Sequence, residues 1–197
     1  GTVLQAVEDS DTTLISLDLD WISIDQLKIA PTLAHSLPHL KSLNISIGTS
    51  IQSRDLSEKK FDIFTFINDL PCLSHLSLSN SRSFVEDRIS LPTILPHLHL
   101  HKVTKLSLGD SQDSSPKVVG FLTQSVPQLR DLELRYVTLY EDNKTWKETF
   151  CALREVLCVY HLRINVHGRV FEAWEKDEVE GVLGWLAENM PDLESGI

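Results

Sequence analysis

The feature that most constrains the fold of this 197-residue chain is a short motif, in which an apolar residue, a proline, any residue and a leucine follow one another. Copies stand at residues 37–40, 70–73, 95–98, 126–129 and 190–193. Proline lacks an amide hydrogen and restrains the residue before it, so each copy is expected to end a helix. Recurrence every few tens of residues indicates stacked structural units, because no single unit could bury its own apolar side chains.

A second pattern, L-x-x-L-x-L, follows or overlaps the first and predicts strands. Its last two apolar residues alternate with polar ones, which is the period of a strand with one buried side. The six copies begin at Leu14, Leu40, Leu73, Val103, Leu129 and Val159. We therefore expect six short, roughly parallel strands. A seventh copy is expected to begin at Leu193.

Between these strands the apolar residues recur at helical spacing, over residues 63–70, 146–157 and 179–190. Helix starts are indicated by Ser115 before Pro116 and by the capping-box pair of Thr145 and Glu148. Each unit is thus predicted to run strand, loop, helix and proline stop. The predicted fold class is α/β: a curved solenoid of about six irregular units, with a parallel sheet on its concave side and the last helix as a partial cap.

These repeats resemble the irregular leucine-rich repeats of the ribonuclease-inhibitor-like superfamily. L-P-H-L-K-S-L-N-I at 37–45, L-R-D-L-E-L-R-Y-V-T-L at 129–139 and T-W-K-E-T-F-C-A-L-R at 145–154 resemble in particular the leucine-rich part of fungal F-box-type proteins. The resemblance implies one leucine-rich-repeat domain over residues 1–197. It also implies a non-catalytic module that selects the target an F-box brings to a cullin-type ubiquitin ligase. The F-box would come from a segment outside this sequence, as in a fragment of a longer protein.

Charged residues gather on the side of the last three predicted strands that would face the concave surface. Earlier strands place small polar residues there, such as Ser77 on the third strand. Neighbouring strands lie about 4.8 Å apart, so the charged residues should form one patch. Either the opposite charges simply pair with one another, or the patch recognises another protein, because charges favour specificity and encounter rate. This charged patch consists of Lys105, Asp131, Glu133, Arg135, His161 and Arg163.

Two other groups could hold a metal ion, which leaves a metal-assisted hydrolase as the alternative function. The first group is a run of histidines at residues 97–101, in which same-side residues of an extended segment lie about 6.6 Å apart, too far for easy chelation. The second group consists of cysteines and histidines at residues 151–167. Its first cysteine, Cys151, is expected in a helix among core residues, whereas His161 points to the concave side. Buried structural cysteines are commoner than such a site, so we expect no cofactor and no catalysis. The groups are His97, His99 and His101, and then Cys151, Cys158, His161 and His167.

The net charge of −10 argues against nucleic acid as a partner, because binding it needs a basic surface. No run of about 18 apolar residues suggests a membrane span. Residues 168–197 carry eight acidic and two basic residues. A polar outer side of the terminal helix explains this excess, and an acidic docking surface is the alternative. Trp185 on that helix is expected to be exposed toward a neighbour, whereas Trp21, Trp146 and Trp174 are expected in the core or at the ends.

Three cysteines without close spacing do not suggest a disulfide framework. We therefore expect an intracellular protein, cytoplasmic or nuclear. The sequons at Asn44 and Asn143 keep a secreted recognition protein as a further alternative.

Overall fold

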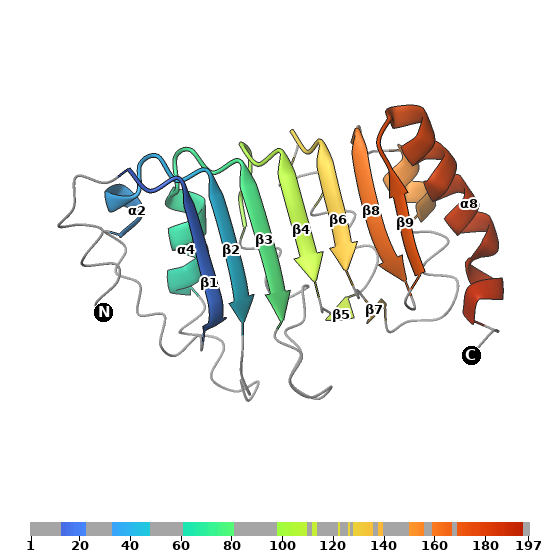
Figure 1. Ribbon diagram of the computed structural model, residues 1–197, viewed down its shortest axis with the longest axis horizontal. Helices are drawn as coiled ribbons and strands as arrows, with labels where there is room; N and C mark the ends of the chain where they lie inside the picture. The colour runs from blue at the N-terminus through green and yellow to red at the C-terminus, as the bar shows by residue number, and fades with distance from the viewer. Residues whose placement is uncertain are drawn as a thin grey trace.

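The computed structural model describes residues 13–22, 33–47, 61–80, 98–109, 112–113, 122, 126, 128–135, 138–139, 150–155, 159–166 and 169–194, and all that follows concerns them. They form an α/β fold around a seven-stranded sheet in the order β1-β2-β3-β4-β6-β8-β9 (Figure 1). The strands are β1 (Ser16–Ile22), β2 (Ser42–Ile47), β3 (His75–Asn80), β4 (Lys105–Gly109), β6 (Asp131–Arg135), β8 (His161–Val166) and β9 (Arg169–Ala173).

The six strands predicted from the L-x-x-L-x-L pattern are confirmed, and they pair in parallel. Equivalent motif positions lie side by side, so that Leu76 pairs with Leu106, and Leu106 with Leu132. The start of each strand is fixed in the same way: the Thr104 carbonyl oxygen accepts from the amides of Arg130 and Asp131, at 2.8 and 3.0 Å. One register therefore runs across these strands, apart from an irregularity between Leu19 and Ile22 near the end of β1.

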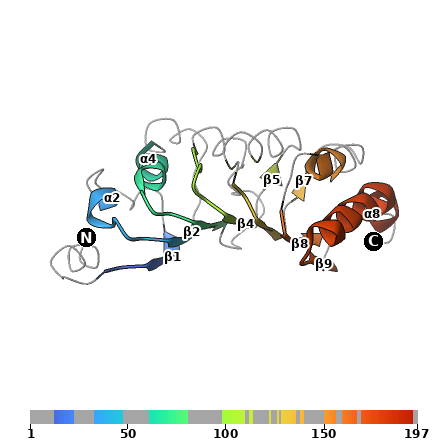
Figure 2. The same ribbon diagram turned by 90° about the horizontal axis from the view of Figure 1, so that it is seen from above.

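The apolar side of the sheet packs against helices to form the core. The helices are α2 (Leu33–Ser36), α4 (Phe61–Asp69), the helical residues 150–155 and α8 (Lys176–Glu194). Phe66 and Phe150 are among the largest fully buried side chains. Figure 2 shows the sheet curving, with α2, α4 and residues 150–155 on its convex side. We call the opposite side, which these helices leave uncovered, the concave face.

The proline motif closes a turn in the copies at 37–40 and 126–129. The Leu40 amide donates to the Leu37 carbonyl oxygen at 3.2 Å, and the Leu129 amide donates to the Val126 carbonyl oxygen at 3.2 Å. The predicted helix starts at 115–116 and 145–148 lie outside the described residues.

At the C-terminal end two predictions are wrong. Helix α8 continues through Pro191 to Glu194, so the last proline motif neither stops the helix there nor starts a seventh parallel strand at Leu193. The place beside β8 is instead taken by β9, which begins at Arg169 and runs antiparallel to β8. A strand that already occupies this edge leaves no parallel continuation next to β8, and the chain turns into α8 (Figure 1).

Two short strands that follow β4 and β6 in the chain form a separate small parallel sheet. They are β5 (Gln112–Asp113) and β7 (Thr138–Leu139). In the part of the chain that the structure describes, no helix has the length and apolar character needed to cross a membrane.

Candidate functional site

Alternate residues of the strands line the concave face in rows that cross the sheet. The structure brings together all members of the charged patch on the three neighbouring strands β4, β6 and β8. One row places Lys105, Asp131 and His161 side by side, and the next places Ser107, Glu133 and Arg163 side by side. Strand β9 extends the second row, because Glu172 pairs with Arg163. That the charged patch binds a partner stays a prediction.

Glu133 lies at the centre of the patch and contacts three side chains. Its Oε2 accepts a hydrogen bond from the Ser107 hydroxyl at 3.0 Å. The Arg135 Nε lies 3.7 Å from Oε2, and the Arg163 Nε lies 3.8 Å from Oε1. The Glu133 side chain is only 22% exposed, so its charge is compensated from three directions inside the face. Glu133 thereby orients both guanidinium groups.

Arg135 reaches back across β4 and passes close to Gly109. The Arg135 Nη2 donates to the Ser107 hydroxyl oxygen at 3.1 Å and, more weakly, to the Ser77 hydroxyl oxygen on β3 at 3.5 Å. A β-carbon built on Gly109 would lie 3.8 Å from the Arg135 Nε and 3.2 Å from the Ser79 β-carbon. A larger side chain at 109 would therefore occupy the space over which the guanidinium extends.

His161 forms a second centre toward the edge of the sheet. Its Nε2 lies 3.2 Å from the Glu172 Oε1, and its Nδ1 lies 3.7 Å from the Asp131 Oδ1. The Trp174 ring stacks on the imidazole, with the ring centroids 3.9 Å apart and the planes 10° apart. The His161 side chain is 15% exposed. The imidazole is thus enclosed by two carboxylates and one aromatic ring.

Opposite charges pair within the patch, except at Lys105. Lys105 lies in register with Asp131, yet no ion pair of its ammonium group occurs among the described residues. It is exposed, and in its row it lies between His75 of β3 and Asp131 of β6. The pairing interpretation therefore accounts for Glu133 and its arginines but leaves one cation available to a partner.

Two contributors to the site, Glu172 and Trp174, were not predicted. They come from β9 and the residue after it, and Trp174, expected in the core or at an end, is 65% exposed on the concave face. The alternation at residues 169–173, with Phe171 and Ala173 pointing inward, was the available signal. Trp185 is exposed, as predicted. The side chains of Trp21 and Trp146 lie outside what the structure describes.

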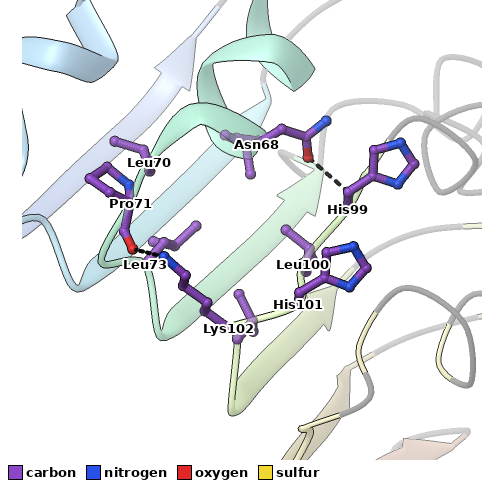
Figure 3. A pocket seen from close by; sticks show the side chains of 10 residues that line it. Asn68, Leu70, Pro71, Leu73, His99, Leu100, His101 and Lys102 are labelled. Atoms are coloured by element: carbon purple, nitrogen blue, oxygen red, sulfur yellow. Dashed lines mark hydrogen bonds between the residues drawn. The ribbon is translucent and has the colours of Figure 1, made fainter.

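The histidine group at 97–101 lies on a different part of the molecule, beside a small hollow of about 150 Å³ between α4 and residues 98–103 (Figure 3). The His99 amide donates to the Asn68 Oδ1 at 2.8 Å, and the Lys102 ammonium donates to the Pro71 carbonyl oxygen at 2.7 Å. The rings of His99 and His101 are parallel, with centroids 6.3 Å apart, and do not converge on a common point. His97 lies outside the described residues.

The cysteine and histidine group is divided in the same way. Cys151 is exposed and not buried as expected, although its neighbour Phe150 is fully buried. His161 is engaged on the concave face, on the other side of the sheet from the helices. Cys158 and His167 lie outside the described residues. Among those that are described, no three His, Cys, Asp or Glu side chains are placed to hold a metal ion.

In the comparisons with known proteins, no family model matches the chain and no curated protein matches it. The resemblance to F-box-type leucine-rich repeats therefore stays an expectation.

Proposed function

We propose that this chain is a non-catalytic protein-binding scaffold of the leucine-rich-repeat type, and that the charged patch on its concave face holds a polypeptide partner. The observation that carries the proposal is the network around Glu133, where contacts at 3.0, 3.7 and 3.8 Å hold a carboxylate and two guanidinium groups on an uncovered surface. Side chains that are already ordered lose less conformational freedom on binding.

The solenoid interpretation is supported by the shared register of the parallel strands. Five strand pairs join β1 through β8 in parallel, at the spacings set by the repeated sequence pattern. A curved surface of this kind offers an extended area to a partner. In such an arrangement the variable residues between the buried leucines determine which partner is chosen.

Lys105 and Arg163 are the residues most available to a partner. Lys105 is exposed and Arg163 is 48% exposed. The contact of Arg163 with Glu133 is formed by its Nε at 3.8 Å, and a guanidinium group can in addition bind a carboxylate through two parallel hydrogen bonds. Arginine is also among the residues that most often dominate protein interfaces.

We propose an intracellular setting and a role as the target-selecting part of an F-box-like ubiquitin ligase receptor. Cys72 and Cys151 are free thiols on the surface, which suits a reducing compartment. Asn44, one of the two sequon asparagines, donates from its side chain to the Asp18 carboxylate at 2.9 Å on the concave face. A glycan there would cover the surface to which we assign binding.

Photo-cross-linking in the source cells tests this function. A photoreactive amino acid at position 105 should give a discrete protein adduct that mass spectrometry identifies. The same residue at position 155, exposed on a helix of the convex side, is the matched control and should not give that adduct. An adduct formed equally at both positions, or formed at 155 alone, would remove the concave face as the binding surface.

A further inference from the structure

The large apolar side chain with the greatest exposure among the described residues lies beside the charged patch. Trp174 follows β9 and is 65% exposed. One side of its ring lies against His161, at a centroid distance of 3.9 Å. Because so much of the residue remains exposed despite this stacking, the other side of the indole ring is open to solvent. Trp185, at 44% exposure, instead tilts against Phe171 with centroids 5.4 Å apart.

Two contacts hold Trp174 in place, the stacking of its ring on His161 and a hydrogen bond of its backbone amide. His161, which supports the ring, is itself positioned by Glu172 at 3.2 Å and Asp131 at 3.7 Å. The Trp174 amide donates to the Glu178 Oε2 at 3.1 Å, which joins the residue to the first turn of α8. A large ring that is ordered before binding presents contact area at low entropic cost.

Acidic residues dominate the surroundings of this ring. Glu172 contacts the supporting His161, Glu178 accepts from the Trp174 backbone amide, and Glu175 and Asp177 are exposed next to it in the chain. Two nearby cations already have acidic partners: Lys176 lies 3.8 Å from Glu180, and Arg163, opposite Glu172 on β8, lies 3.8 Å from Glu133. An open indole face is negative through its ring quadrupole, and tryptophan is the best aromatic partner for a cation.

We propose that Trp174 is the platform on which a cationic side chain of the partner, arginine or lysine, docks against the concave face. Trp174 supplies the ring, His161 supports it from behind, and the carboxylates of Glu172 and Glu178 supply the opposite charge. This rests on the proposed function and adds to it the chemistry of the partner: a basic residue contacts the β9 end of the face.

An acetylated tetra-arginine peptide amide is the probe that tests this site. Titration should shift the indole N–H resonance of Trp174 in a ¹H–¹⁵N spectrum and leave that of Trp185 in place. A tetra-citrulline peptide has the same length and nearly the same planar groups but no charge, and it should shift Trp174 much less. A tetra-lysine peptide should act like tetra-arginine, with a smaller effect.

Variants separate the ring from the acidic surroundings. Trp174→Leu should weaken tetra-arginine binding by about three- to thirty-fold, and Trp174→Phe, which keeps an aromatic ring and the stacking position, should fall between. Trp185→Leu, the matched control, should bind as the unaltered chain does. Glu172→Gln should weaken binding without changing the fold. The indole resonances other than that of Trp174 report whether the fold is unchanged.

Equal shifts with arginine and citrulline, or equal affinity after Trp174→Leu, would overturn the proposal. These results would not bear on the photo-cross-linking at Lys105, which can still place a partner on the concave face without a cation at Trp174. Conversely, a Trp174-dependent arginine response together with cross-links only on the convex side would keep this site and remove the wider function.

Discussion

Replacing Glu133 by glutamine tests whether the network on the concave face is as tightly organised as its distances indicate. Glu133→Gln keeps the size of the side chain and one acceptor oxygen but removes the charge that Ser107, Arg135 and Arg163 share. A hydrogen bond to a charged acceptor contributes about 1.5–3 kcal/mol and a neutral one about 0.5–1.5 kcal/mol. The difference for Ser107 is therefore about 1 kcal/mol.

The two arginine contacts add to this value. Both arginine side chains are nearly half exposed, and the distances to Glu133 are 3.7 and 3.8 Å, so each contact is worth about 0.2–1 kcal/mol. The expected loss in the free energy of unfolding is therefore about 1.4–3 kcal/mol. Urea denaturation should show it as a midpoint lower by roughly 0.7–1.5 M, for a slope near 2 kcal/mol per M.

The matched control is Glu188→Gln on α8, where the side chain is exposed and the expected change is within about 0.5 kcal/mol. The loss caused by Glu133→Gln should also shrink in 1 M salt toward about 1 kcal/mol, the part assigned to Ser107, because the arginine contacts are then screened. An effect of Glu133→Gln no larger than that of the control would mean that Glu133 does not organise the patch.

Two further predictions concern the core and the alternative function. Leu132→Ala, at a fully buried position of β6, should lower the unfolding free energy by about 2–5 kcal/mol in the same assay, and a loss below 1 kcal/mol would mean that β6 is not packed as described. Tag-free protein should contain far less than one zinc per chain by elemental analysis, and near-stoichiometric zinc would favour the metal-assisted hydrolase.

The strands were predictable because their signal is local. Leucines two residues apart must lie on the same side of a strand, and here that side is buried, as Leu106 and Leu108 show on β4. The same alternation puts Lys105 on the opposite, exposed side. The charged patch followed from the sequence once the parallel register was assumed.

The C-terminal end was not predictable in the same way. A proline motif that coincides with helix ends elsewhere lies inside α8 at Pro191, so the motif alone does not determine where a helix ends. The stacking of Trp174 on His161 depends on the antiparallel pairing of β8 with β9. The repeated sequence pattern does not predict this pairing. Cys151 is exposed beside the buried Phe150, because adjacent helical residues point in different directions.

An affinity measurement with the cross-linked partner tests whether the concave face binds a protein. Lys105→Glu reverses an exposed charge within the patch, and Lys41→Glu makes the same change at an exposed position before β2. If the concave face binds the partner, Lys105→Glu should weaken binding at least about tenfold, a change of about 1.4 kcal/mol, while Lys41→Glu should change it less than about threefold. Equal affinities for the two variants would contradict binding at the concave face.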